Sequence, residues 1–106
     1  MIARLWNART TESLAHNYLK HFSGTVLPTL RKFEGYVSST VLTRPSSGAV
    51  EILVTTVWRS FVAIHAFAGP DREAAVVARE AAALLTDYDC RVRHFEVAVT
   101  DGSSFA

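Results

Sequence analysis

The sequence has one cysteine, one methionine and no long apolar run, and each scarcity excludes a class of protein. Cys90 cannot form a disulfide within the chain, which fits a reducing compartment. No stretch approaches the roughly 20 apolar residues that a membrane-spanning helix needs. The first ten residues, MIARLWNART, carry charged and polar side chains where a secretory signal needs an apolar block. We therefore expect a soluble cytoplasmic protein with no membrane association.

Neither sign of charge is in clear excess. The chain has 11 Lys and Arg against 10 Asp and Glu, so its net charge is +1. A protein that binds nucleic acid would be expected to carry a clustered basic face, and this balance gives no support for one. Glycine-rich phosphate loops and Ser/His/Asp signatures are absent from the sequence. His16 and His21 are five residues apart and do not share a helix face well, so we expect no metal site.

Apolar periodicity predicts four strands and two helical regions. Alternation predicts strands over residues 2–8, 36–44, 49–58 and 91–99. The turn cluster PSSG, at residues 45–48, joins the second and third strands as a hairpin.

The helical regions are predicted from their caps and their apolar stripes. Thr10 or Thr11 can cap the first helix, whose stripe then recurs every four residues at Leu14, Tyr18, Phe22 and Val26. Gly24 and Pro28 predict an interruption there, and Gly35 stands where a C-cap glycine would. Ser60 can cap the second helix, which Gly69-Pro70 breaks. An alanine-rich helical segment is expected over residues 71–88.

The element order β-α-β-β-α-β predicts an α+β fold of the ferredoxin-like type, with a four-stranded antiparallel sheet and helices on one face. We expect one domain over residues 1–100 and a flexible tail over residues 101–106. The uncovered sheet face would carry Ile2, Trp6, Leu53 and Val57. Because such an apolar face needs a partner, we expect a homodimer that packs sheet against sheet.

Four segments carry a family resemblance: IARLWN at the start, TTVWRS at the end of the third strand, AIHAFAG in the following helix and VRHFEVAV in the last strand. In this order and spacing, the chain resembles the antibiotic-biosynthesis monooxygenase family of dimeric α+β barrels. That resemblance implies oxidation of a small aromatic or polyketide-like molecule by molecular oxygen with no bound cofactor. It also implies a ligand pocket between the sheet and the helices of each subunit.

The resemblance carries over to individual positions only in part. Trp58 matches the strand-end tryptophan that lines the pocket in cofactor-free members, whereas Val54 stands at an asparagine, Ile64 at a tyrosine, and the region of Val77 at an arginine. Asn7 matches the first-strand asparagine of haem-degrading members. Their helix tryptophan is matched by Phe67, and their haem-ligating histidine falls near Val77, which weakens the case for haem degradation.

The resemblance implies that seven side chains point toward the pocket: Asn7, Val54, Thr56, Trp58, Phe61, Ile64 and Phe67. Two interpretations remain open. These residues can simply fill the core, as small cores normally do. Alternatively, they can line an apolar cavity for a planar aromatic ligand, with Asn7 and the Trp58 indole N–H as polar groups that hold it.

A cofactor-free oxygenase needs a dry pocket, a donor for the substrate anion and a base. We therefore take Trp58, Asn7 and His65 as catalytic candidates, and Val54, Phe61, Ile64, Phe67 and Val77 as substrate-binding candidates. His65 has the alternative of being a surface histidine, because helical spacing places it off the stripe that contains Phe61, Ile64 and Phe67. The alternative function is a non-catalytic dimer of the same fold that binds a small apolar molecule or only assembles.

The last strand carries His94 and Glu96 on one side. We expect them to form a polar ladder with Arg4 and Glu51 on the uncovered sheet face, where it would fix the register of the dimer. His94 as a catalytic base is the alternative. Cys90 lies at a predicted helix end, which disfavours a reactive thiolate, so it is not expected to be a nucleophile.

Overall fold

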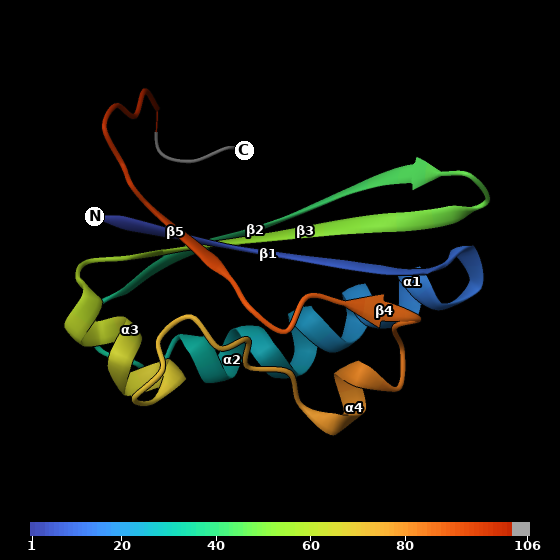
Figure 1. Cartoon of the computed structure of the whole chain (residues 1–106), viewed down its shortest axis with the longest axis horizontal. Coiled ribbons are helices and arrows are strands. Elements are labelled where there is room, and N and C mark those ends of the chain that lie inside the picture. The colour runs from blue at the N-terminus through green and yellow to red at the C-terminus, as the bar shows by residue number, and fades with distance from the viewer. Residues whose placement is uncertain (103–106) are drawn as a thin grey trace.

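The computed structural model describes residues 1–102 as one antiparallel sheet with helices packed against one face (Figure 1). The strands are β1 (Ile2–Thr11), β2 (Tyr36–Ser46), β3 (Ala49–Trp58), β4 (Asp87–Tyr88) and β5 (Arg93–Glu96). Their order is β2-β3-β1-β4, with β5 also pairing with β1. The predicted ferredoxin-like α+β fold is confirmed, except that two short strands, β4 and β5, replace the single last strand. Residues 103–106 of the expected tail lie outside the described residues.

The first helical region runs through three elements without leaving helical backbone. They are α1 (Glu12–His21), the π-helical η1 (Phe22–Val26) and α2 (Leu27–Leu30). Thr11 is the N-cap, since its side-chain oxygen accepts a hydrogen bond of 3.2 Å from the Leu14 amide. The predicted interruption at Gly24 and Pro28 is therefore a π-helical segment followed by a short α-helix that contains Pro28.

The β2–β3 hairpin is longer than predicted. β3 has the predicted bounds, but β2 continues through Pro45 and Ser46, so the turn is reduced to Ser47 and Gly48. Both turn residues have positive φ, 50° and 81°, which suits the tight turns that match the twist of a hairpin. Pro45 is tolerated because β2 is an edge strand of the sheet.

The register between β1 and β3 decides which residues face the helices. Arg4 lies opposite Thr56 and Trp6 opposite Val54, and these residues face the helices together with the Ile2–Trp58 pair. The residues that alternate with these along both strands, including the Asn7–Leu53 pair, face away from the helices. The predictions that Ile2 and Trp6 lie on the uncovered face, and that Asn7 points toward the helices, are wrong. Leu53 and Val57 do lie on the uncovered face, as predicted.

Residues 71–88 do not form the predicted helix. Only α4 (Arg79–Ala82) is helical, and residues 71–75 run alongside residues 90–92. The Ala75 amide donates to the Cys90 carbonyl at 2.9 Å, and the Val92 amide donates to the Glu73 carbonyl at 2.8 Å. The Arg91 guanidinium donates two hydrogen bonds to the Asp71 carboxylate, at 2.9 and 3.1 Å. These backbone and ion-pair contacts outweigh the helix propensity of the alanines.

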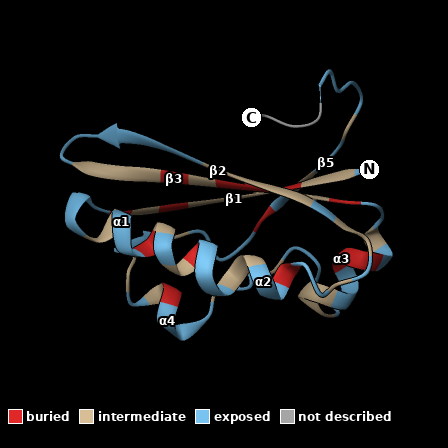
Figure 2. Ribbon diagram, turned by 180° about the vertical axis from the view of Figure 1, so that it is seen from behind, coloured by how far each residue is buried: buried red, intermediate tan, exposed pale blue. Residues whose placement is uncertain are grey.

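The core lies between the sheet and the helices, where Figure 2 shows the buried residues of both layers facing one another. Trp58, Ile52 and Ile64 are its largest fully buried apolar side chains. Ser60 is the N-cap of the helix α3 (Phe61–Ala68), as predicted. Its hydroxyl oxygen accepts a hydrogen bond of 3.3 Å from the Ala63 amide. In the described part of the chain, no helix is long and apolar enough to cross a membrane.

Gly35 is where the chain between α2 and β2 passes closest to α3. It has a φ of +88°, and a Cβ built there would lie 2.6 Å from the Cβ of Ala63. Gly35→Ala should therefore lower the free energy of unfolding by about 2–4 kcal/mol, which combines the left-handed backbone cost with overpacking. Gly48→Ala is the matched control, because Gly48 has a φ of +81° but no atom within 4 Å of an added Cβ. Urea unfolding should show a clearly smaller loss for Gly48→Ala, and equal losses would contradict the close approach at Gly35.

Candidate functional site

A cavity of about 80 Å³ lies between the sheet and the helices. Its floor is formed by β1 and β3, and its sides come from the first helical region, α3 and α4. Residues 76–78, which belong to no helix or strand, also line it. The lining is mostly apolar, and representative members from these elements are Trp6, Tyr18, Val54, Phe67, Val77 and Ala81.

The predicted substrate-binding residues divide into three groups. Val54, Phe67 and Val77 line the cavity. Ile64 is fully buried in the core beside it and is not part of the lining. Phe61 lines a separate, more open hollow beside β5, together with His94. The structure therefore brings together only part of the predicted pocket.

Trp58 supports the cavity wall and does not line it. The side chain is fully buried, and its indole ring stacks on Phe67 with 5.2 Å between ring centroids. Its Nε1–H donates to the Thr56 hydroxyl at 2.8 Å. This proton is therefore already engaged and is not free to hold a ligand in the cavity.

The other two catalytic candidates lie away from the cavity. Asn7 is on the uncovered face, where its Oδ1 is buried and has no hydrogen-bond partner among residues 1–102. His65 is exposed on α3 and does not line the cavity. Neither residue is positioned to touch a ligand between the sheet and the helices.

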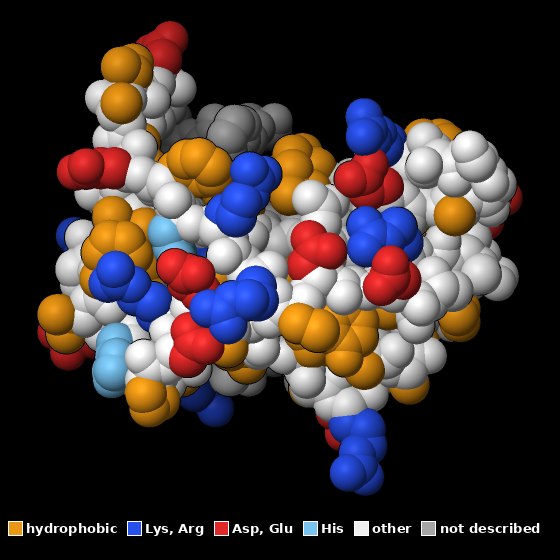
Figure 3. All heavy atoms as spheres, viewed as in Figure 1, with side chains coloured by type: hydrophobic (Ala, Val, Ile, Leu, Met, Phe, Trp, Pro, Cys, Tyr) orange, Lys and Arg blue, Asp and Glu red, His pale blue; other side chains and the backbone are white. Residues whose placement is uncertain are grey.

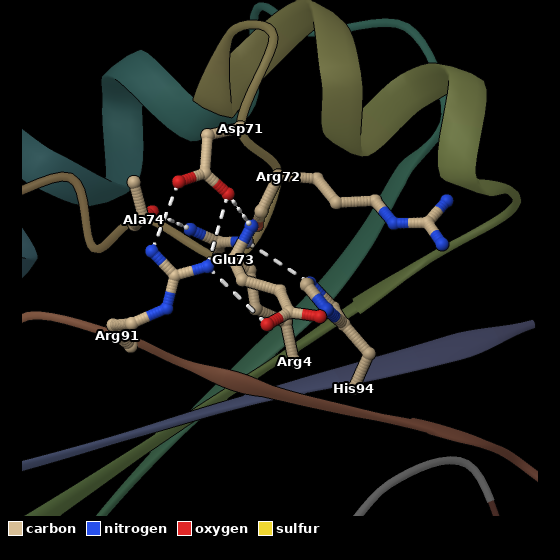
Figure 4. Close-up of polar contacts among 7 residues, drawn as sticks. All are labelled: Arg4, Asp71, Arg72, Glu73, Ala74, Arg91 and His94. Carbon is tan, nitrogen blue, oxygen red and sulfur yellow. Dashed lines mark hydrogen bonds and ion pairs between the residues drawn. The ribbon is translucent and has the colours of Figure 1, made fainter.

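Arg4 lines the cavity and was missed as a site residue. Its side chain is 5% exposed, although it sits on a strand among apolar neighbours. Nη1 donates to the Arg72 carbonyl and lies 3.0 Å from Nε2 of His94, while Nη2 donates to the Ala74 carbonyl at 2.8 Å (Figure 4). The guanidinium lies over the Phe67 ring, 5.6 Å from its centroid. Arg4 thus ties residues 72–74 to the sheet while facing the cavity.

The charge state around Arg4 follows from burial. Burial lowers the pKa of Arg4 to about 10, so the side chain remains a cation at neutral pH. Burial also lowers the pKa of His94, and the neighbouring positive charges of Arg4 and Arg72 lower it further, against an opposing effect of Glu73. His94 is therefore neutral at pH 7, and its Nε2 can accept the hydrogen bond from Arg4.

Arg4 was misplaced because the alternation of the first strand was assigned to the wrong face. The predicted ladder of Arg4, Glu51, His94 and Glu96 on the uncovered face is wrong. Arg4 and His94 lie opposite one another on the face toward the helices, and Glu51 instead pairs with Arg44 at 2.6 Å. The sequence carried no signal that could have placed Arg4, since Ala8 and Thr10, the fully buried residues on its side of β1, are small or polar.

Charged pairs lie at the edge of the sheet near β4 and along residues 71–91. Arg9 pairs with Asp87 at 2.8 Å, and Arg91 pairs with Asp71 at 2.9 Å. Figure 3 shows acidic and basic side chains next to one another across this side of the molecule. These ion pairs are exposed, so each contributes little to stability by itself.

The cavity does not fit a haem. No histidine, cysteine or methionine lies among its lining residues, and Val77 occupies the region where haem-degrading proteins were expected to supply the ligand. A volume of about 80 Å³ is also far below that of a macrocycle. Within residues 1–102, no group of three or more His, Cys, Asp or Glu side chains could hold a metal ion.

Solved structures with the same fold include a monooxygenase and proteins described as proposed monooxygenases. A proposed antibiotic biosynthesis monooxygenase from Bacillus cereus is similar with a TM-score of 0.66, at 18% identity over 95% of this chain and 96% of that chain. A monooxygenase from the Streptomyces coelicolor gene ActVA-Orf6, in complex with nanaomycin D, is similar with a TM-score of 0.54, at 18% identity over 95% of this chain and 91% of that one.

A haem-degrading protein has the same fold too. MhuD from Mycobacterium tuberculosis, with two haems bound in its active site, is similar with a TM-score of 0.62, at 25% identity over 96% of this chain and 100% of that chain. No family model matches the sequence. No curated protein matches it either. The chain therefore has the fold of the antibiotic-biosynthesis monooxygenase structures, and the resemblance found in the sequence is confirmed at that level.

His94 should make stability depend on pH. Because its pKa is lowered in the folded protein from the ordinary value of 6.5, the unfolded chain binds a proton there first as the pH falls. The free energy of unfolding should therefore decrease as the pH is lowered through about 6.5 toward the folded-state pKa. His94→Gln should flatten this decrease, as measured by urea unfolding at several pH values. The exposed His65 supplies the control, since His65→Gln should retain the wild-type slope, and an equal effect of the two substitutions would refute the assignment.

Proposed function

We propose that this chain is a dimeric protein of the antibiotic-biosynthesis monooxygenase type that binds a small aromatic molecule and oxidises it with molecular oxygen, without a bound cofactor. The observation that carries the proposal is the mostly apolar cavity between sheet and helices, lined by Trp6, Tyr18 and Phe67. The likeness in fold to two monooxygenase structures supports it.

The reaction that suits such a cavity starts from a phenol. Oxidation of a phenol to a para-quinone consumes one O₂ and releases one water, so one oxygen atom enters the substrate and the other leaves as water. A phenolate can supply the electrons directly, which removes the need for a redox group. The contribution of the protein would be to exclude water and to stabilise the oxyanion.

Tyr18 is the residue placed to donate to that oxyanion. It lines the cavity, and burial raises its pKa to about 12, so it carries its proton at neutral pH. The cavity lining contains no carboxylate or histidine. We therefore propose that the substrate enters as an anion, or loses its proton to water, and that no side chain of the cavity acts as a base. In this arrangement Trp58 acts by holding Phe67 in place.

A second candidate function is binding without reaction. It is favoured by the cavity lining, which contains no carboxylate or histidine that could act as a base. The cavity volume of about 80 Å³ is below the 300–1,000 Å³ that is usual for ligand sites. A two-ring substrate would need residues 76–78 to move outward. These residues have irregular backbone, and Val76 is 52% exposed. Moving this wall outward would therefore break fewer packing contacts than moving a helix or a strand.

The dimer would form through the uncovered sheet face. Apolar side chains on three strands face outward there, with Leu42 45% exposed and Phe95 49% exposed next to Leu53 and Val57. This face lies opposite the helices in Figure 1. A second copy packed face to face would remove these side chains from water, which is the driving force that we propose for assembly.

Filling the cavity tests the binding function. Ala81 is 5% exposed and lines the cavity from α4, whereas Ala83 is exposed at the end of the same helix. Ala81→Leu should weaken binding of 1-naphthol by at least about tenfold, because the added side chain occupies the ligand volume. Ala83→Leu should bind as the wild type does, as measured by calorimetric titration. Unchanged binding by Ala81→Leu would place the ligand elsewhere.

Turnover separates the two candidate functions. With 1-naphthol the wild type should consume oxygen and form 1,4-naphthoquinone in a one-to-one ratio, followed by an oxygen electrode and by absorbance. Tyr18→Phe should lower this rate by about 10²-fold or more, as removal of one oxyanion donor does in other enzymes. Binding of 1-naphthol without oxygen consumption would favour the non-catalytic function.

The proposed interface is tested with a charge. Leu53→Arg places a cation in the middle of the uncovered face and should convert the protein to a monomer at micromolar concentration, because a lone buried charge costs several kcal/mol. Val62→Arg is the control, since Val62 is 80% exposed on α3, away from the sheet face. Light scattering after gel filtration gives the mass. A monomeric wild type, or a Leu53→Arg dimer, would contradict this interface.

A further inference from the structure

Arg4 is the only charged side chain in the lining of the cavity. The lining otherwise consists of apolar residues, Tyr18 and Thr56. A cation that is 5% exposed usually has a carboxylate next to it, because burial of an unpaired charge is costly. Among residues 1–102, no carboxylate lies within ion-pair distance of Arg4.

The hydrogen bonds of Arg4 leave one edge of its guanidinium without a partner. Nη1 uses both of its protons, on the Arg72 carbonyl and on His94, and Nη2 uses one on the Ala74 carbonyl. Nε–H makes no hydrogen bond within residues 1–102. Nε and Nη2 form the edge of a guanidinium that can bind both oxygens of a carboxylate.

A purely structural role does not account for a cation at this position. The two carbonyl bonds of Arg4 do fix residues 72–74 against the sheet, but a neutral side-chain amide can donate to carbonyls without the cost of burying a charge. The nearby cation Arg72 does not compete for this site, because its side chain points away from Arg4 in Figure 4 and lies over Phe61, 3.9 Å from the ring centroid.

From this arrangement we infer that the ligand of the cavity is an aromatic carboxylate, whose two oxygens bind Nε and Nη2 of Arg4 and whose ring packs among Trp6 and Phe67. The inference rests on the proposed binding function and specifies its ligand, so that a substrate of the proposed oxidation would carry a carboxylate as well as a phenol. The guanidinium and the Phe67 ring are already stacked at 5.6 Å, so a carboxylate at Arg4 places an attached ring among the aromatic side chains of the cavity. The ligand would supply the negative charge that the chain does not.

Matched pairs of acid and amide test the inference on the wild-type protein. Benzoate and 1-naphthoate should bind at least about tenfold more tightly than benzamide and 1-naphthamide at neutral pH, since each amide keeps the shape and loses the charge. Calorimetric titration measures all four affinities. Equal affinity within a pair would overturn the inference and leave the binding function standing. Absence of binding by all four would overturn the inference, and absence of 1-naphthol binding as well would overturn the binding function.

Two variants identify the residue responsible. Arg4→Lys keeps the positive charge but loses the paired N–H donors that bind both carboxylate oxygens. The variant should therefore lose most of the preference for the acid, while the amide binds as before. The control Arg72→Lys should retain the full preference. Should Arg4→Lys fail to fold, the Arg4 Nε–H resonance of the wild type gives the answer. It should shift strongly on addition of benzoate and not on addition of benzamide, and an unmoved resonance would overturn the inference.

Discussion

The register between β1 and β3 is the constraint on which the candidate site depends. Ten residues of β1 pair in sequence with ten of β3, from Ile2 opposite Trp58 to Thr11 opposite Ala49. Because side chains alternate along both strands, this single alignment assigns every residue of the two central strands to one face. It places Arg4, Trp6 and Val54 under the helices, and Asn7 and Leu53 on the opposite face. A slip of one residue would exchange the two sets.

Much of the fold could be predicted because its signals are local. A hydroxyl residue before a helix and a strongly alternating strand depend only on nearby residues. The cap at Ser60 and the bounds of β3 were predicted correctly, and Thr11 is one of the two residues predicted to cap the first helix. The face of β1 could not be predicted in the same way. Ile2 and Trp6 on one parity and Leu5 on the other are all apolar, so hydrophobicity does not say which side meets the helices. Only pairing with β3 decides it.

The same difference between local and distant contacts explains residues 71–88. Their alanines favour a helix. However, Asp71 and Glu73 form ion pairs with Arg91, and the Ala75 amide donates a hydrogen bond to the Cys90 carbonyl. The resulting extended segment brings the carbonyls of Arg72 and Ala74 over Arg4 and provides Val77 as a cavity wall. The candidate site therefore depends on a tertiary contact that no periodicity in the sequence could reveal.

The hairpin strand β2 has one consequence for assembly. It forms an outer edge of the sheet, and an open edge can recruit a further strand by backbone pairing. Here Pro45 offers no amide hydrogen near one end, and an irregularity between Tyr36 and Ser38 disturbs the hydrogen-bond repeat at the other. Only the central part of this edge strand is regular enough to pair with a strand of another chain. Growth into fibrils along the edge is thereby discouraged.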